Sequence, residues 1–109
     1  MCIFCEIAHH RQKAEIVYEN ERIIVFKDIN PKAPVHLLLV PKKHIESINH
    51  LEKEDKELIS EIIFLAKDLA KQKKIAKSGY RLIFNVGRGG GQIIDHLHLH
   101  LIGGGKLNE

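Results

Sequence analysis

The apolar positions of the chain follow two different periods. Between residues 54 and 74, large aliphatic side chains recur at spacings of four, three and four, which predicts an amphipathic helix with one apolar stripe. The stripe consists of Leu58, Ile62, Leu65 and Leu69. Elsewhere the apolar runs are short, as is typical of strands. The predicted strands are residues 16–19, 22–27, 35–40, 80–86 and 96–102.

The order of these elements predicts the fold class. Strands precede the long helix and further strands follow it, and the first two strands are joined by a short connection. This order favours an α+β fold in which an antiparallel sheet is covered by a helix. Ile3, Phe4 and Ile7 indicate a further short helix or turn near the start of the chain. A length of 109 residues suits one core, so we expect residues 1–109 to form a single domain.

Composition and charge narrow the function classes. Hydrophobic residues make up 44% of the chain and charged residues 28%, which is typical of a globular protein. The net charge of +3 is small and suits an anionic substrate. The lysines late in the predicted helix are not interleaved with aromatic residues, so we expect no nucleic acid partner. The sequence has neither an apolar run of membrane-spanning length nor a secretory signal, so we expect a cytoplasmic protein without a membrane partner.

A run of alternating histidines lies near the carboxyl end, where the sequence reads HLHLHLI. In a strand, His96, His98 and His100 share one face, while the leucines between them share the other and can pack under the helix. Histidine is not a preferred strand residue, so this alternation indicates more than tolerated polar positions. Spacing alone leaves two functions open. One is a metal site, because H-x-H pairs can chelate zinc, and the other is nucleophilic catalysis by an imidazole.

The segment before these histidines favours phosphate chemistry. It reads GRGGGQ from Gly87 to Gln92, which is richer in glycine than a hairpin turn requires. Glycines permit positive φ and let backbone N–H groups approach an anion closely. The segment is not a P-loop, because no Gly-Lys-Ser/Thr follows. Beside histidines that are available as neutral nucleophiles at pH 7, it favours phosphate transfer.

The two cysteines of the chain, Cys2 and Cys5, form a C-x-x-C motif. A disulfide scaffold is not expected from a single pair, and a thioredoxin-like redox motif would need a preceding strand. Metal binding remains. Two cysteines supply only half of a tetrahedral zinc shell, so the other ligands must come from elsewhere in the chain.

The chain resembles the histidine-triad superfamily, whose signature is H-φ-H-φ-H-φ-φ with φ apolar. Residues 96–102 match this signature in full. Two blocks extend the resemblance over almost the whole chain: VFKDINPKAPVHLLLVPKKHI at 25–45 and NVGRGGGQIIDHLHLHLIGG at 85–104. They are similar to the Hint-like branch of purine nucleotide-binding hydrolases. The resemblance implies a five-stranded antiparallel sheet with one long helix, and a homodimer in which two sheets join into one of ten strands.

The resemblance also implies the reaction. His98, the middle histidine, is the expected nucleophile: it attacks the α-phosphorus of a nucleoside phosphoramidate or related nucleotide. Water then releases a nucleoside monophosphate from the nucleotidyl-histidine. His100 is expected to hold a phosphate oxygen, His36 to join this hydrogen-bond network and His96 to support the arrangement. No catalytic metal is expected.

The remaining nucleotide contacts are implied in the same way. Asp28 is expected to bind the ribose hydroxyls, since a carboxylate can accept from both of them. The residues expected around the phosphate and the leaving group are Asn85, Gly91, Gln92 and Ile93. The residues expected around the purine are Phe4, Ile7, Phe26 and Ile29. Many relatives carry Ser or Thr where this chain has Ile93, so one hydroxyl near the leaving group is missing.

The resemblance completes the metal shell. In bacterial relatives that begin with C-x-x-C, a structural zinc is held by both cysteines, the histidine of P-K-K-H and the first triad histidine. In this sequence the four ligands are Cys2, Cys5, His44 and His96. Such a Cys2His2 site would tie the amino-terminal segment to the active-site strand.

Three other functions stay open at this stage. The chain can be a non-catalytic purine nucleotide-binding or interaction module, with Ile93 as the sign of lost chemistry. It can be a dinucleoside polyphosphate hydrolase of the same superfamily. It can also be a zinc hydrolase that uses the histidine triad as metal ligands.

Overall fold

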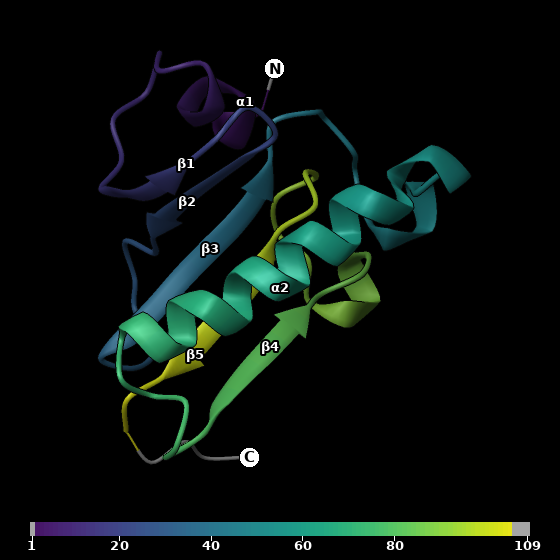
Figure 1. Cartoon of the computed structure of the whole chain (residues 1–109). Coiled ribbons are helices and arrows are strands. Elements are labelled where there is room, and N and C mark those ends of the chain that lie inside the picture. The colour runs from purple at the N-terminus through teal and green to yellow at the C-terminus, as the bar shows by residue number, and fades with distance from the viewer. Residues whose placement is uncertain (1, 106–109) are drawn as a thin grey trace.

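The computed structural model describes residues 2–105 and contains a five-stranded antiparallel sheet, a long helix and a short amino-terminal helix (Figure 1). The strands are β1 (Ile16–Glu19), β2 (Ile23–Lys27), β3 (Val35–Pro41), β4 (Tyr80–Phe84) and β5 (Leu99–Gly103). The helices are α1 (Ile3–Ala8) and α2 (Lys56–Gln72), with 3-10 turns at Ile48–His50, Lys53–Asp55 and Arg88–Gly90. The predicted α+β class is confirmed.

The sheet has two differently occupied faces, with β3 at its centre in the order β1-β2-β3-β5-β4. Side chains of a strand alternate between faces. In β3, Leu37 and Leu39 join the core on the helix side, whereas His36 and Leu38 face the opposite side. His100 of β5 pairs with Leu38 across the ladder and therefore shares its face.

Helix α2 lies across one face of the sheet (Figure 1). The core between them contains Leu58, Ile62 and Leu69 of the helix and Leu97, Leu99 and Leu101 of the histidine run. The prediction that these leucines pack under the helix is confirmed. Neither α2 nor any other helix within residues 2–105 is long and apolar enough to cross a membrane.

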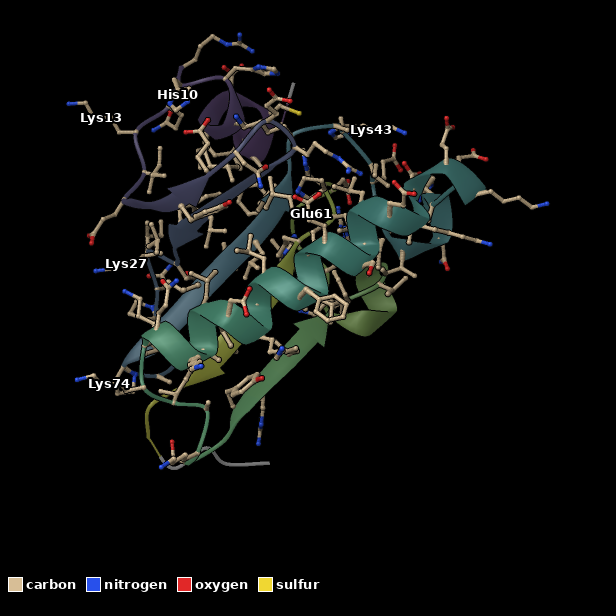
Figure 2. All side chains as sticks on the ribbon, viewed as in Figure 1. His10, Lys13, Lys27, Lys43, Glu61 and Lys74 are labelled. Atoms are coloured by element: carbon tan, nitrogen blue, oxygen red, sulfur yellow. The ribbon has the colours of Figure 1, made fainter. Side chains whose placement is uncertain are left out.

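Charged side chains lie around the outside of this core (Figure 2). Lys13, Lys27 and Lys74 extend away from the ribbon. Glu61 of α2 instead fastens the helix to the sheet, because its carboxylate accepts from Asn20 Nδ2 at 3.1 Å and lies 3.3 Å from the guanidinium of Arg22. The turn between β1 and β2 is thereby held against the helix.

The last strand is shorter at its beginning than the pattern predicts. A strand is predicted over residues 96–102, but β5 begins at Leu99, which pairs with Leu39 of β3. Before that point the chain has left the ladder, since the Leu97 N–H donates to the Ile45 carbonyl at 2.7 Å. The other boundaries differ from the predicted ones by at most two residues at either end, the usual ambiguity of element ends.

Candidate functional site

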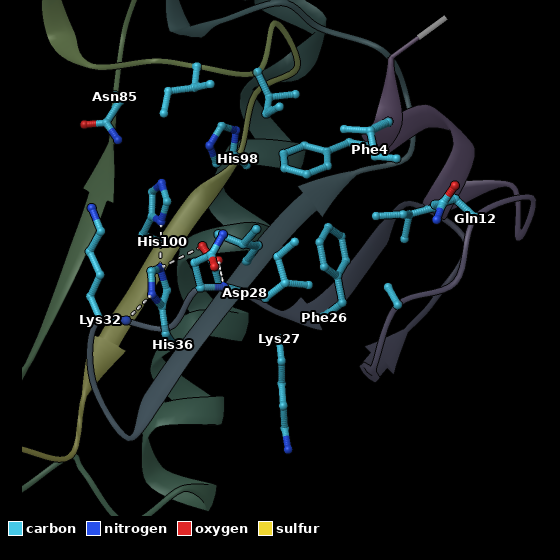
Figure 3. Close-up of a pocket in the computed structure, with 18 of the residues that line it drawn as sticks. Phe4, Gln12, Phe26, Lys27, Asp28, Lys32, His36, Asn85, His98 and His100 are labelled. Carbon is cyan, nitrogen blue, oxygen red and sulfur yellow. Dashed lines mark hydrogen bonds and ion pairs between the residues drawn. The ribbon is translucent and has the colours of Figure 1, made fainter.

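A pocket of about 480 Å³ opens on the face of the sheet opposite α2. Its walls come from α1, β2, β3, β5 and the loops that follow β2 and β4. Figure 3 shows His98 and His100 toward one side of the pocket, and Phe26 and Gln12 toward the other. The predicted site residues that line it are Phe4, Ile7, Phe26, Asp28, Ile29, His36, Asn85, Gly91, Ile93, His98 and His100.

A chain of hydrogen bonds fixes the tautomers of two imidazoles (Figure 3). The backbone N–H of Lys32 donates to His36 Nδ1 at 3.1 Å, so this nitrogen carries no proton. His36 Nε2 therefore holds the ring hydrogen and donates it to His100 Nδ1, 2.9 Å away. His100 then carries its own hydrogen on Nε2, as a donor for an anion in the pocket. Asp28 Oδ2 lies 3.4 Å from His36 Nε2.

His98 has the opposite tautomer. Its Nδ1 lies 2.7 Å from the carbonyl oxygen of His96, and only an N–H can form that bond, so Nε2 carries the lone pair. Phe4 packs edge-on against the His98 ring with centroids 5.0 Å apart, and the His100 ring centroid lies at 4.9 Å. The pocket therefore presents a nucleophilic nitrogen beside an N–H donor.

Burial keeps these imidazoles uncharged. Removal from water lowers the pKa of His36 and of His98, although the Asp28 carboxylate acts in the opposite direction on both. The pKa of His100 falls to about 4, first through burial and then through the neighbouring rings of His98 and His36. A neutral imidazole retains at pH 7 both the lone pair that a nucleophile needs and the N–H that a phosphate oxygen needs.

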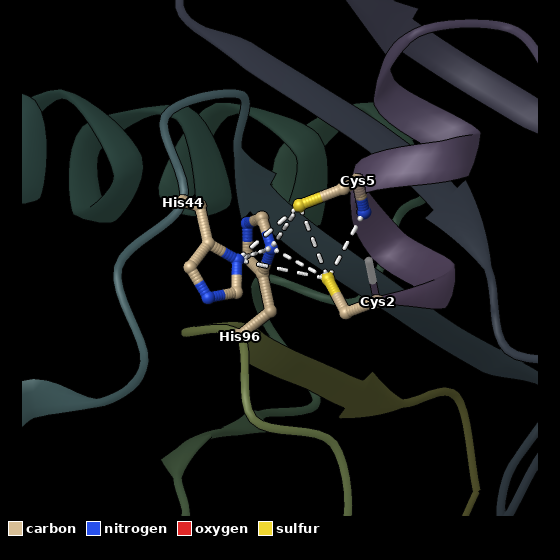
Figure 4. A group of neighbouring side chains, drawn as sticks. All are labelled: Cys2, Cys5, His44 and His96. Atoms are coloured by element: carbon tan, nitrogen blue, oxygen red, sulfur yellow. Dashed lines mark hydrogen bonds between the residues drawn. The ribbon is translucent and has the colours of Figure 1, made fainter.

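Four side chains gather beside α1, outside the pocket (Figure 4). Cys2 Sγ, Cys5 Sγ, His44 Nδ1 and His96 Nδ1 lie within 4.8 Å of one another. Their separations run from 3.1 Å between the two imidazole nitrogens to 3.7 Å between Cys2 and His44. Ligand atoms about 2.1–2.3 Å from a tetrahedral ion lie about 3.4–3.8 Å apart, so the group can hold a metal ion.

The ring of His96 is oriented for this group and does not line the pocket. Its Nε2 donates to the Pro41 carbonyl at 2.8 Å, which leaves Nδ1 as the ligand atom. Burial lowers the pKa of His96 to about 4, so Nδ1 keeps its lone pair. Burial also raises the pKa of the Cys5 thiol, so metal uptake by this group must release a proton.

A second group of possible metal ligands lies in the pocket and includes one histidine of the triad. Asp28, His36 and His100 do lie within 4.8 Å of one another. However, both nitrogens of His36 are engaged, since Nδ1 accepts from Lys32 N–H and Nε2 faces His100 Nδ1 at 2.9 Å. His96 is turned toward the cysteines instead. The three triad histidines thus serve two different groups, which does not favour a zinc hydrolase with the triad as ligands.

Gln92 is a predicted site residue that does not line the pocket. Its side chain is buried, and its amide donates to the carbonyls of Glu46 at 2.6 Å and Ile94 at 2.9 Å while accepting from the Gly87 N–H at 2.9 Å. Gln92 thereby fixes the glycine-rich loop. Gly91 in that loop has a φ of +85°, in the left-handed region that favours glycine.

The pocket also contains residues that sequence reasoning missed. They are Ile3, Gln12, Lys13, Ala14, Lys27, Asn30, Lys32, Leu38 and Ile94. Leu38 could have been found from strand period, because it lies two residues after His36 and so on the same face. The sequence offered less to identify Lys32, which is marked only by its place in the loop that precedes His36.

Comparisons with known proteins agree with this fold. The family model described as "Scavenger mRNA decapping enzyme C-term binding" matches residues 1–107. A HIT-like protein of Buchnera aphidicola is 47% identical over 98% of this chain and 94% of its own length. The purine nucleoside phosphoramidase of Escherichia coli K12 is 39% identical over 96% of this chain and 88% of its own length. The crystal structure of a HIT family hydrolase from Legionella pneumophila has a TM-score of 0.97 at 47% identity, covering 99% of this chain and 96% of that one.

These matches, together with the alternating histidines, define the class of protein. The chain belongs to the histidine triad (HIT) family. Its relatives include proteins named as a hydrolase and as a purine nucleoside phosphoramidase. The family resemblance inferred from the sequence is confirmed.

Proposed function

We propose that this protein is a nucleotide hydrolase that transfers the nucleotidyl group of a purine nucleoside phosphoramidate to His98 and then to water. The observation that carries the proposal is the pair of fixed tautomers. His98 offers a lone pair at Nε2, and His100 offers an N–H beside it in the same pocket. The 39% identity to a purine nucleoside phosphoramidase supports the substrate class.

The pocket has the size and the polarity for one nucleotide. Its volume of about 480 Å³ lies within the range of small-molecule pockets. The α-phosphate would lie against His98 and His100, and the ribose hydroxyls would donate to the Asp28 carboxylate. The purine would fill the apolar end, where the rings of Phe4 and Phe26 meet edge-on with centroids 5.4 Å apart.

The reaction proceeds in two displacements at phosphorus. His98 Nε2 attacks the α-phosphorus, its lone pair forms the N–P bond, and the P–N bond of the phosphoramidate breaks. The leaving nitrogen takes up a proton from solvent and departs as an amine. Water then attacks the same phosphorus, the bond to Nε2 breaks, and the monophosphate leaves while the proton lost by water passes to solvent. The His98–His96 carbonyl bond stabilises the positive charge that the ring carries between the two steps.

Trapping the covalent intermediate tests this mechanism. Mixing the protein briefly with adenosine phosphoramidate and quenching with denaturant should give a mass increase of one adenylyl group, located on His98 by peptide sequencing. The same protocol on His98→Asn should give none. Turnover without any adduct in rapid-quench samples would favour direct attack by water. Binding of adenosine monophosphate without turnover would instead favour a nucleotide-binding module.

We also propose that the ion held by the cysteine–histidine group is zinc. Two thiolates and two imidazoles form a donor set that zinc prefers in structural sites, where all four tetrahedral positions are filled by protein. The fit rests on the donor atoms Cys2 Sγ, Cys5 Sγ, His44 Nδ1 and His96 Nδ1. Such an ion would serve the fold by joining α1 to the segment before β5.

We propose that the protein forms a homodimer through the β4 edge of the sheet. An edge strand offers unpaired backbone groups to a second copy. Apolar side chains accompany this edge, since Leu82 of β4 is 37% exposed and Phe64 of α2 is 62% exposed. Leu82 faces the helix side, because it pairs with Leu101 of the helix-side core.

The dimer is expected to dissociate when this apolar edge is charged. Leu82→Glu combined with Phe64→Glu should reduce the mass measured by light scattering during gel filtration to that of one chain. Tyr18→Glu, on the opposite edge strand β1, provides a control with comparable exposure of 40%. A wild-type protein that elutes as a monomer at all concentrations would contradict the proposal.

A further inference from the structure

The proposed reaction places a phosphate anion against rings that carry no charge. His36 Nδ1 accepts a hydrogen bond and so does His100 Nδ1, which means that each ring holds a single proton. His98 must also be neutral to act as a nucleophile. A phosphate removed from bulk water is stabilised by a nearby positive charge, especially as charge moves onto its oxygens during transfer. The cation in this pocket has therefore to come from another residue.

The charged residues that line the pocket are Lys13, Lys27, Asp28 and Lys32. Two of the three lysines are directed elsewhere. Lys27 Nζ pairs with Glu15 at 2.5 Å, and the side chains of Lys13 and Lys27 extend away from the molecule in Figure 2. Asp28 has the wrong sign for a phosphate.

Lys32 is directed toward the phosphate-binding end. Figure 3 shows its side chain extending past His36 toward His100 and Asn85, on the side of the pocket away from Phe26. Within residues 2–105 no carboxylate forms an ion pair with its ammonium group. The charge is therefore available to a ligand beside the His100 N–H.

The backbone that carries Lys32 is held in place by three hydrogen bonds. Its own N–H donates to His36 Nδ1 at 3.1 Å, the Asn30 N–H donates to Asp28 Oδ1 at 2.8 Å, and the Asp28 N–H donates to the His36 carbonyl at 3.0 Å. Pro31 precedes Lys32 and restricts the backbone further. The same bond that fixes the tautomer of His36 thus also fixes the position from which the lysine side chain starts.

We propose that the Lys32 ammonium binds a non-bridging oxygen of the transferred phosphoryl group, beside the N–H of His100. This inference rests on the proposed function and adds to it the residue that supplies positive charge. An ammonium on a flexible stem suits this task because it acts as a mobile point charge. Its contact persists while the phosphorus moves between the leaving nitrogen, His98 and water.

Nucleotide binding with and without the phosphate tests the role of Lys32. Affinities of adenosine and adenosine monophosphate are measured by calorimetry for the wild type, Lys32→Gln, Lys32→Arg and the control Lys74→Gln, which removes a charge outside the pocket. Lys32→Gln should lower the affinity for adenosine monophosphate about tenfold or more, as expected for the loss of a charge-assisted hydrogen bond. The affinity for adenosine, which has no phosphate, should stay unchanged. Lys32→Arg should recover most of the affinity. The affinity of Lys74→Gln should stay within about twofold of the wild type, since Lys74 lies outside the pocket.

Turnover of adenosine phosphoramidate by the same variants gives a second measurement. Lys32→Gln should lower kcat/KM by about 10- to 100-fold, and the affinity of adenosine monophosphate should depend less on salt than in the wild type. If Lys32→Gln lowers the affinities for adenosine and for its monophosphate equally, Lys32 has a structural role. If it changes neither affinity, Lys32 does not contact the nucleotide. Either result overturns the inference about Lys32 and leaves the proposed function standing. A wild type that neither binds the monophosphate nor hydrolyses the phosphoramidate overturns the proposed function as well.

Discussion

Replacing His98 by asparagine is expected to abolish turnover while leaving the fold and nucleotide binding in place. The loss in kcat should be about a thousandfold or more, because a covalent route ends when its nucleophile is removed. Asparagine is the preferred replacement, since its amide can still donate toward the His96 carbonyl that now accepts from His98 Nδ1. The protein should therefore keep its melting temperature and its affinity for adenosine monophosphate.

A steady-state assay with a fluorogenic adenosine phosphoramidate measures this loss. His50→Asn supplies the matched control, because His50 is exposed, lies outside the pocket and undergoes the same chemical change. This control should retain full activity. If His98→Asn hydrolyses the substrate at the wild-type rate, His98 is not the nucleophile, and a metal-activated or solvent water would have to replace it.

The alternation of the triad histidines predicts the positions of two of the three side chains and fails for the third. A period of two predicts that His98 and His100 share a face, and both line the pocket. The same period places His96 with them, yet its ring turns to the cysteines because the chain has left the ladder before Leu99. That departure depends on the Ile45 carbonyl, which accepts from Leu97 N–H. A hydrogen bond between residues so far apart in the sequence cannot be predicted from the local alternation of residue types.

Two further residues illustrate the same limit. Gln92 was predicted to contact the nucleotide, but its buried side chain bonds to backbone groups and only its neighbour Ile93 lines the pocket. The sequence alone does not distinguish a glutamine that satisfies buried backbone groups from one that contacts a ligand. The sequence marks Lys32 only by its place between two prolines in the loop before His36. Its importance depends on the tautomer of His36, which is set by the folded backbone. The period of two thus placed His98 and His100 on one face, and the family resemblance supplied the other predicted pocket residues, whereas the hydrogen bonds that orient these side chains form only in the folded chain.

Removing the metal ion that we propose for Cys2, Cys5, His44 and His96 is expected to weaken nucleotide binding, although none of these four residues lines the pocket. Helix α1 has six residues, too few to be stable alone, and its cap is the Cys2 Sγ, which accepts from the Cys5 N–H at 3.2 Å. The same helix carries Phe4 and Ile7 into the purine end of the pocket. A metal ion on the two cysteines would therefore hold the helix that forms one wall of the pocket.

The variant His44→Ala removes one ligand without touching the pocket, and His50→Ala is its control. His44→Ala should lose bound metal in elemental analysis and about 4 kcal/mol of unfolding free energy, if free metal in the wild-type sample exceeds the dissociation constant about a thousandfold. Its affinity for adenosine monophosphate should fall by roughly tenfold, equivalent to about 1.4 kcal/mol of lost contact with the purine. Treatment of the wild type with a strong chelator should reproduce both losses, and added zinc should reverse them. Metal loss with unchanged affinity would mean that packing alone positions α1, because the Phe4 ring would then be held by Phe26 and His98 without help from the ion.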